Sequence, residues 1–578
     1  MRLSLWGSLV LYKEINMEKW VVAAKRADFN QIAHDFSIDP VMARLIRNRD
    51  VIGNEQIQRY LYGNKEQLHS PWRMKDMEKA VNILCEKISN HARIRVIGDY
   101  DIDGVMSTYI LETGLRRVGA DVDFMIPNRI TDGYGLNEHL ILQAKEEGRD
   151  TIVTCDNGIS AFEQIERAKS LGMTVIVTDH HELLDEKIPA ADAVINPKRQ
   201  DCTYPFTGLC GAAVAWKLIV ALYEKCGIPK EEAEDFLEYA AFATVGDVMD
   251  LVEENRIIVK EGLKQLHHTK NTGLRELMRV NDLEPECLNA YHIGFVLGPC
   301  MNASGRLDTA KRALELLRSE NVEDAARLAG DLKSLNESRK ALTLQGVELA
   351  VEQVEKTSIK EDKVYVIYLP ECHESLAGII AGRIRERYYH PVFVLTKGEE
   401  GIKGSGRSIE SYHMFDAMAE CREVFTHFGG HKMAAGLSLP EENVELLRRR
   451  INETCALTEE DFVPKITIDV PMPFSYVTKE LIVQMELLEP FGKGNTKPIF
   501  AQKDIKVLNH RIIGKNRNVL SLKLDDGMGR TIDGICFQNA EELEQRIVSG
   551  KSVSVTYYPT LNTYQGRESI QIVISHFQ

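Results

Sequence analysis

Paired cysteines are missing from this sequence. Its eleven cysteines are an odd number, lie scattered along the chain and include no Cys-x-x-Cys pair. That pattern argues against a disulfide-stapled secreted domain and offers neither a thiolate zinc site nor a dithiol redox motif. We therefore expect reduced thiols that pack as small apolar side chains, and a cytoplasmic protein.

Long apolar runs are missing as well. No stretch approaches the roughly 20 apolar residues that a membrane-spanning helix needs. Residues 3–12 are apolar and resemble the core of a short signal peptide, but they lack a small-x-small cleavage site and run directly into Lys13 and Glu14. Met17 begins a more natural N-terminus. We therefore interpret residues 1–16 as an upstream extension and predict no membrane association.

Positive charge is in deficit, with 71 Lys and Arg against 86 Asp and Glu, a net charge of −15. This balance argues against binding nucleic acid with the whole surface, because phosphate affinity comes from Lys and Arg. A local basic groove remains possible. Residues 491–530 hold nine Lys and Arg against three Asp, a local excess of +6. Phe500 and Tyr564 are candidate base-stacking residues in this part of the chain, although such aromatics more often belong to a core.

The chain contains enough residues for about three or four domains at roughly 100–200 residues each. From residue 94 short β-rich runs alternate with helical stretches, which predicts an α/β catalytic domain with a parallel sheet. Residues 311–356 contain no proline and have leucines at helical spacing, so we expect one long connecting helix. A second α/β unit follows, with Gly-rich turns at 401–406 and 429–430, and alternating runs after residue 464 predict a small β-barrel.

These patterns divide the chain into five expected segments. They are an N-terminal extension and helical segment (1–75), the catalytic domain (76–310), the connecting helix (311–356), the second α/β domain (357–460) and the C-terminal barrel (461–578).

Acidic and imidazole side chains follow three of the predicted strands. The sequence GDYDIDG at 98–104 follows a strand at 94–97, DNG at 156–158 follows a strand at 151–155, and DHH at 179–181 follows a strand at 174–178. Asp247 comes after an apolar helical run, where a lone buried charge is costly. A strand-end Asp is often only a helix cap. Because parallel strands end at one edge of a sheet, however, we expect these groups to meet.

Oxygen ligands with one or two imidazoles suit Mn²⁺ or Mg²⁺ better than Zn²⁺. Several shared carboxylates suit two ions, the arrangement that activates a water and stabilises the leaving oxygen in phosphoester cleavage. A calcium loop is the alternative for GDYDIDG, but Ile110 stands where that loop needs a Glu. The residues therefore predict a two-metal phosphoesterase.

Taken in order, these motifs resemble the DHH phosphoesterase superfamily, named after the triplet at 179–181. Within it the chain is similar to the bacterial single-strand-specific exonucleases, from Met17 to the C-terminus. Further segments carry the likeness: VGDVMDL at 245–251, GPCMNASGRL at 298–307, GSGRS at 404–408, FGGH at 428–431 and PFGKGN at 490–495. The resemblance implies a DHH catalytic domain, a DHH-associated domain that holds nucleic acid across a cleft, and a C-terminal OB-fold barrel. It also implies 5′→3′ release of 5′-mononucleotides from single-stranded DNA, in recombination and repair.

The resemblance also implies a role for individual residues. Metal ligation falls to Asp101, Asp103, Asp156, His180 and Asp247. Asp99 and His181 support catalysis, and His181 assists the leaving group. The residues implied to bind the DNA, including its terminal 5′-phosphate, are Arg129, Asn302, Arg306, Ser405, Arg407 and His431. The chain departs from many relatives at Cys300 and Cys372, both expected on the nucleic-acid side.

Two other functions stay open on the sequence. One is another DHH enzyme, either a phosphodiesterase for short oligonucleotides or cyclic dinucleotides or a pyrophosphatase, although such relatives lack the long connector and the barrel. The other is a catalytically dead DNA-binding scaffold, although such proteins lose the acidic ligands that this chain keeps. The implied partners are single-stranded DNA, a single-strand-binding protein and a RecQ-type helicase, and we expect a monomer.

Overall fold

A computed structural model describes residues 18–578 except 130, 131, 134, 184, 185, 399, 400, 515–517, 538, 539, 549–551 and 565. The expected upstream extension lies outside the described residues, as do two of the basic residues in the 491–530 stretch and the side chain of Tyr564. The chain divides into two compact units. One comprises Asp28–Lys340 and Val483–Lys497, and the other comprises Ala341–Ile482 and Pro498–Gln578 with the N-terminal segment up to Ala27.

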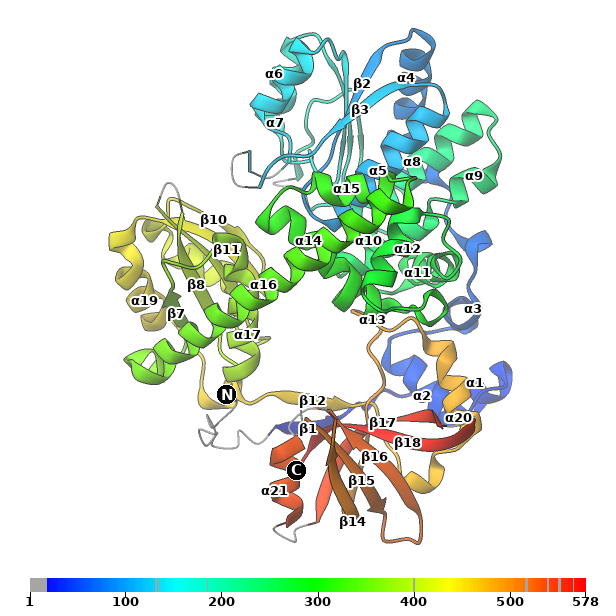
Figure 1. The fold of residues 1–578 in the computed structure, drawn as a ribbon, viewed down its shortest axis with the longest axis vertical. Coiled ribbons are helices and arrows are strands. Elements are labelled where there is room, and N and C mark those ends of the chain that lie inside the picture. Colours follow the sequence, from blue (N-terminus) through cyan, green and yellow to red (C-terminus); the bar gives the residue numbers. More distant parts are fainter. Residues whose placement is uncertain are drawn as a thin grey trace. The chain divides into compact units, whose positions relative to one another are not determined.

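The first unit is built on a five-stranded parallel sheet in the order β3-β2-β4-β5-β6 (Figure 1). Its strands are β2 (Arg93–Ile97), β3 (Asp121–Met125), β4 (Thr151–Cys155), β5 (Thr174–Thr178) and β6 (Ala193–Ile195). The predicted parallel α/β fold is therefore confirmed. The strand order reverses between β2 and β4, and in open parallel sheets such a switch point is where ligands bind.

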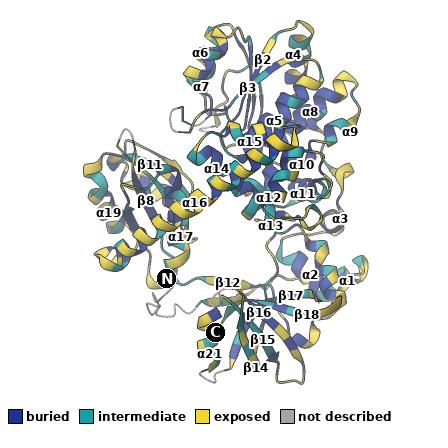
Figure 2. Ribbon diagram, in the orientation of Figure 1, coloured by how far each residue is buried: buried dark blue, intermediate teal, exposed yellow. Residues whose placement is uncertain are grey.

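Helices cover both faces of this sheet, so its central strands β4 and β5 and the edge strand β6 are almost wholly buried. Helices α4 (Met77–Ser89), α5 (Ile102–Arg117) and α8 (Gly211–Cys226) pack on one face, with Val96, Val153 and Ile176 in their shared core. Helices α6 (Glu138–Glu146) and α7 (Phe162–Ser170) pack on the other. Figure 2 shows α6 and α7 with exposed outer sides, whereas α5 and α8 are largely buried.

Shorter helices complete the first unit. They are α1 (Phe29–Phe36), α2 (Pro40–Asn48), α3 (Asn54–Tyr62), α9 (Lys230–Glu234), α10 (Leu237–Gly246), α11 (Glu253–Leu266), α12 (Thr272–Val280), α13 (Ala290–His292) and α14 (Gly298–Leu307). The chain returns to this unit at residues 483–497, where the Arg256 guanidinium donates to the carbonyl oxygens of Leu487 and Leu488, both at 2.8 Å. The sequence places these residues in the C-terminal segment (461–578), whereas in the structure they pack on the first unit.

The single connecting helix expected at 311–356 is instead two helices. α15 (Lys311–Arg318) packs into the core of the first unit, and α16 (Val322–Lys356) follows after a short break. The break arises at Asn321, whose side-chain oxygen accepts from the backbone N–H groups of Glu323 (2.7 Å) and Asp324 (3.1 Å) and so caps a new helix. Helix α16 is about 52 Å long at 1.5 Å per residue.

The second unit contains a five-stranded sheet in the order β10-β11-β9-β8-β7. Its strands are β7 (Tyr365–Tyr368), β8 (Val392–Gly398), β9 (Gly401–Arg407), β10 (His427–Gly430) and β11 (Ala434–Leu439), and its helices are α17 (Ala377–Tyr388), α18 (Met414–Glu420) and α19 (Val444–Glu453).

The Gly-rich turns predicted at 401–406 and 429–430 are wrong, because both segments are strands. β9 pairs on both sides, with β8 and β11, so its backbone N–H groups belong to the sheet. The glycines of β9 instead let neighbouring side chains pack directly against its backbone. A side chain at Gly404 would lie 2.4 Å from Leu395, and one at Gly406 would lie 2.3 Å from the Met414 sulfur.

The C-terminal sheet has the strand order β13-β14-β15-β16-β18-β17, and β14 also pairs with β17, so five strands form a closed series of pairings. The bounds are β13 (Val470–Pro471), β14 (Phe500–Ile513), β15 (Val519–Asp525), β16 (Thr531–Cys536), β17 (Val553–Tyr564) and β18 (Arg567–Phe577). Two helices belong to this part of the chain, α20 (Lys479–Met485) and α21 (Ala540–Val548), and β1 (Lys19–Val22) and β12 (Lys465–Ile468) form a separate two-stranded parallel sheet. Phe500 is fully buried against Tyr557, with ring centroids 5.9 Å apart, so it belongs to the core and not to a stacking surface.

All eleven cysteines are free thiols, and six of them are buried. Within the described ranges, no helix combines the length and the apolar character needed to cross a bilayer.

Candidate metal centre

The switch point of the parallel sheet carries three carboxylates. Asp99 and Asp101 follow β2, and Asp156 follows its neighbour β4. Asp101 caps α5, because its Oδ1 accepts from the N–H groups of Asp103 (3.0 Å) and Gly104 (3.1 Å). Asp156 has a positive φ of 60°, a backbone conformation that Asp tolerates better than most residues. The predicted convergence of these strand ends is confirmed.

Asp103 lies in the first turn of α5, where its carboxylate meets the N-terminus of α8. Its two oxygens accept from the backbone N–H groups of Gly211 (2.6 Å) and Ala212 (2.7 Å). A side chain at Gly211 would lie 2.7 Å from the Asp156 Cβ, so only glycine lets the helix end approach this closely. The helix dipole favours an anion here, which fixes the orientation of the Asp103 carboxylate.

His180 brings a third strand end, that of β5, into the cluster. Its Nε2 lies 3.1 Å from Asp156 Oδ1, 3.5 Å from Asp103 Oδ2 and 3.9 Å from Asp247 Oδ2. Asp247 follows the last residue of α10 and is the most exposed of these carboxylates. Burial and the neighbouring His181 lower the pKa of His180 to about 3, so the ring is a neutral imidazole that can serve as a ligand.

Donor atoms gather in three overlapping groups, each within 4.8 Å: Asp99, Asp101 and Asp156; Asp103, His180 and Asp247; and Asp156, His180 and His181. The first two groups share no residue. The third group contains Asp156 from the first and His180 from the second, so the two groups lie next to each other. Two adjacent cations would fit this arrangement.

The state of Asp99 tests whether a cation fits. Its side chain is fully buried, and among the described residues neither carboxylate oxygen has a hydrogen bond of good geometry. The backbone N–H groups of Tyr100 and Gly135 act to lower its pKa, but they do not offset the burial. Burial, together with the charge of Asp101, raises the pKa of Asp99 to about 8, and burial with Asp103 raises that of Asp247 to about 8. Buried carboxylates in such proximity are stable as anions only when a cation compensates them. The donor set therefore fits divalent cations.

The sequence predicts Asp179 near the cluster but gives it no role of its own, and the structure shows what it contacts. Its carboxylate accepts from His181 Nδ1 at 2.8 Å and from the backbone N–H groups of Ile159, His180 and His181. Burial alone would raise its pKa, but these donors hold the pKa of Asp179 below its usual range. Burial would likewise lower the pKa of His181, yet the bond to Asp179 raises it to about 9. The signal was available, since Asp179 is the first residue of the DHH triplet.

Three of the predicted substrate-binding residues lie beside this cluster. Asn302 Oδ1 accepts from the Ile102 N–H at 2.8 Å and so anchors the loop that carries Asp101. The Arg129 guanidinium lies 4.7 Å from the centroid of the Tyr100 ring. Burial raises the pKa of Tyr100 to about 12, while the charges of Arg129 and Arg306 act to lower it, so both cations are close.

The other three predicted residues belong to the second unit. Ser405 and Arg407 lie on β9, and both adjoin Gly378 in the first turn of α17. Burial, with the charge of Arg385, lowers the pKa of Arg407. His431 donates its N–H to the Ala434 oxygen at 2.8 Å, and Ala434 pairs with Arg407, so all three lie at one end of the sheet.

Cys300 and Cys372, the two positions at which the chain departs from many relatives, are not exposed on the surface. Cys300 is fully buried in the core of the first unit, next to Asn281 and Asn336. Our expectation that it faces nucleic acid is therefore wrong. Cys372 is partly buried beside Ile380 and Gly346.

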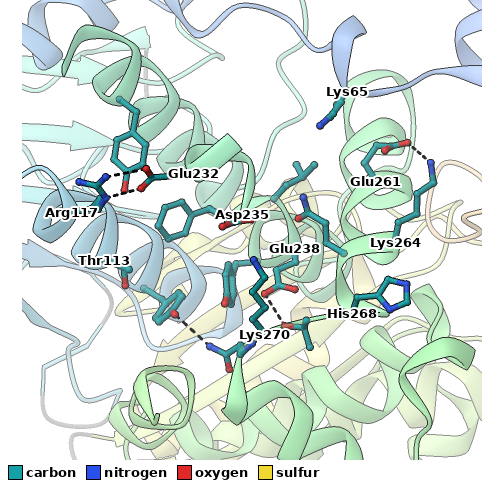
Figure 3. Close-up of a pocket in the computed structure, with 18 residues that line it drawn as sticks. Lys65, Thr113, Arg117, Glu232, Asp235, Glu238, Glu261, Lys264, His268 and Lys270 are labelled. Carbon is teal, nitrogen blue, oxygen red and sulfur yellow. Dashed lines mark hydrogen bonds and ion pairs between the residues drawn. The ribbon is translucent and has the colours of Figure 1, made fainter. Parts of the chain in front are cut away.

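A pocket of about 640 Å³ lies elsewhere in the first unit, among α5, α10 and α11 (Figure 3). None of the cluster residues lines it. Its carboxylates are in part neutralised, by Arg117 on Glu232 and by Lys264 on Glu261.

A parallel sheet in this strand order, with Asp and His side chains gathered at its switch point, defines a metal-dependent phosphoesterase domain of the DHH type. Comparison with known families agrees with this class. The DHH family N-terminal domain matches residues 93–244, the DHHA1 domain matches 361–457, and the RecJ OB domain matches 468–576.

Relatives extend the likeness to nearly the whole chain. It is 35% identical to the single-stranded-DNA-specific exonuclease RecJ of Bacillus subtilis over 96% of this chain and 70% of that protein. With RecJ of Escherichia coli the identity is 34%, over 93% of this chain and 96% of that protein. RecJ of Thermus thermophilus in complex with Mn²⁺ has a similar structure, with a TM-score of 0.82 and 26% identity over 97% of this chain and 79% of that chain. The chain belongs to the RecJ family, which confirms the resemblance drawn from the motifs.

Proposed function

We propose that this protein is a single-stranded-DNA-specific exonuclease that hydrolyses phosphodiester bonds with two divalent ions, Mn²⁺ or Mg²⁺. The proposal rests on one observation: two groups of three ligand side chains lie next to each other, because Asp156 of one group and His180 of the other are in contact. The relatives named for this activity, and the RecJ structures solved with Mn²⁺ and with Mg²⁺, support the same reaction and the same ions.

Each residue of the cluster has a distinct part in this proposal. Asp99, Asp101 and Asp156 hold one ion, and Asp103, His180 and Asp247 hold the other. When bound, two such ions activate a water and stabilise the leaving oxygen. The α8 N-terminus fixes Asp103 in its ligating orientation. His181 is held through Nδ1 by Asp179, so its Nε2 is the atom that would give a proton to the leaving oxygen.

We further propose 5′→3′ polarity, set by a site for the terminal 5′-phosphate at Ser405 and Arg407. A guanidinium binds phosphate oxygens in a forked geometry, and the N-terminus of a helix favours anions. Both features meet at Gly378, where the Arg407 side chain contacts the first turn of α17. Arg129, Arg306 and His431 would contribute further contacts to the strand near its 5′ end.

The OB domain would retain the rest of the strand, through phosphate contacts from its basic residues. Release of mononucleotides and a role in recombination and repair follow from the family. A single-strand-binding protein and a RecQ-type helicase are the partners that we propose, and we expect the protein to act as a monomer.

A degradation assay tests this function. A 5′-phosphorylated single strand labelled at either end is incubated in Mn²⁺, beside a duplex and a dinucleotide, with wild type and Asp156→Ala. We expect mononucleotides from the 5′ end of the single strand only, and none from the variant. Cleavage of the dinucleotide alone would assign the protein to the short-oligonucleotide phosphodiesterases, and binding without cleavage in Mn²⁺ or Mg²⁺ would leave the DNA-binding scaffold.

A further inference from the structure

Two aromatic side chains lie exposed on the helical segment that leads to the metal centre. Tyr291 and Phe295 are 62% and 69% exposed. Their rings stack on each other, with centroids 4.9 Å apart and an angle of 26° between the planes. Two large apolar rings that pack mainly on each other leave their outer faces in water, and exposed apolar surface of this kind commonly marks a binding site.

The backbone beneath these rings is also unusual. α13, a π-helical turn at Ile293–Leu297 and α14 follow one another without a gap from Ala290 to Leu307. Pro299 has no N–H to donate to the preceding turn, and the wider π turn accommodates it. Ile293 and Leu297 are fully buried, so the segment is anchored on one side and presents its aromatic pair on the other. Turns of this type occur frequently at functional sites.

The same segment reaches the metal centre at two places. Asn302 lies in α14, seven residues after Phe295, and its Oδ1 accepts from the N–H of Ile102 next to Asp101. At Gly294 the segment adjoins Val245, two residues before Asp247, where a side chain built on the glycine would lie 3.6 Å from Val245 Cγ1. Eleven residues separate Tyr291 from Asn302, about 16 Å along the helix. That length corresponds to a few nucleotides of a strand that leaves the metals.

We propose that Tyr291 and Phe295 form a stacking platform for bases on the 3′ side of the bond being cleaved. Every base has a flat π face, so such a platform holds a strand of any sequence. The bases of a duplex are already stacked and paired, so the platform binds unpaired bases and thereby contributes to single-strand selectivity. This inference rests on the proposed function. The segment that carries the two rings also contacts the loop of Asp101 through Asn302, which favours a nucleic acid over a protein as the ligand of the platform.

The experiment compares two 5′-phosphorylated single strands, one with all its bases and one with abasic sites in place of the second to sixth nucleotides. KM is measured in Mn²⁺ for wild type, for Tyr291→Ala with Phe295→Ala, and for Tyr62→Ala as control. Tyr62 is an exposed tyrosine at the end of α3 in the same unit. Phe295→Trp tests rescue by another aromatic ring. A second readout is the fluorescence of 2-aminopurine in the same positions, which stacking quenches on binding without divalent metal.

For wild type we expect KM to rise about five-fold or more on the abasic strand, a preference that the double variant loses and that Tyr62→Ala and Phe295→Trp keep. The double variant should also fail to quench 2-aminopurine. Equal KM values for both strands with wild type would overturn the platform, as would a double variant that keeps the preference for bases. If wild type degrades neither strand, the proposed function fails on its own, and quenching by wild type but not by the double variant still supports the platform.

Discussion

Replacement of Arg407 by Gln is predicted to abolish the preference for a 5′-phosphorylated end. The Arg407 guanidinium donates from Nη1 to the Gly406 oxygen at 2.7 Å and adjoins the first turn of α17. Burial and the charge of Arg385 lower its pKa, and no carboxylate of the described chain comes near enough to compensate it. Such a cation binds an incoming phosphate strongly because no carboxylate of the described residues competes for the guanidinium.

The expected loss of preference can be estimated from the hydrogen bonds between the guanidinium and the phosphate. Hydrogen bonds to charged groups contribute about 1.5–3 kcal/mol, which corresponds to about 10- to 150-fold in kcat/KM. The assay compares kcat/KM for strands with a 5′-phosphate and with a 5′-hydroxyl. Wild type should prefer the phosphate by a factor in that range, and Arg407→Gln should treat the two strands alike.

Two further variants make this comparison specific. Arg407→Lys keeps the charge but loses the forked geometry, so it should retain part of the preference. Arg383→Gln changes an exposed arginine on α17 that pairs with Glu386, and it should behave as wild type. An undiminished preference for the 5′-phosphate in Arg407→Gln would refute the assignment of this site.

Three predictions concern stability. Mn²⁺ at a hundred times its Kd should stabilise wild type by about 2.7 kcal/mol in thermal unfolding, and Asp156→Asn should lose most of that gain; an equal gain in both would contradict the metal assignment. Glu254→Gln leaves the buried ammonium of Lys217 without the carboxylate now 2.6 Å away, so chemical denaturation should show a loss of about 3–5 kcal/mol, and a loss below about 1 kcal/mol would be inconsistent with a buried pair. Burial raises the pKa of Glu238, which accepts from Thr269 in the pocket of Figure 3, to about 7. The stability tied to its proton is fully present below about pH 4.5 and is lost as the pH rises through about 7, so Glu238→Gln should reduce the difference in unfolding free energy between pH 5 and 8.5 by up to about 3 kcal/mol. An unchanged pH dependence would contradict that burial effect.

The metal centre was predictable from sequence because parallel strands deliver their last residues to one edge. Asp101, Asp156 and His180 could each be placed from a short β-rich run and the polar residue after it. The helix-to-carboxylate contact at Gly211 could not, because it joins segments more than a hundred residues apart. Asp179 was visible in the sequence, but its task of orienting His181 depends on a side-chain contact that only the structure gives.

Each difference between the predicted and the observed fold has its own physical cause. Glycine usually marks turns, so the sequence predicts a turn where the structure has β9, a strand whose glycines make room for the Leu395 and Met414 side chains. The break before α16 lacks both Gly and Pro, and its only signal is the capping residue Asn321. The return of residues 483–497 to the first unit depends on contacts with Arg256, far away in the chain, which no periodic pattern reveals.

The most direct test of the central claim is anomalous diffraction at the manganese edge from crystals of this protein grown with Mn²⁺. The account predicts two peaks roughly 3.5–4 Å apart, one among Asp99, Asp101 and Asp156 and one among Asp103, His180 and Asp247. A single peak, or peaks away from these side chains, would contradict a two-metal centre connected through Asp156.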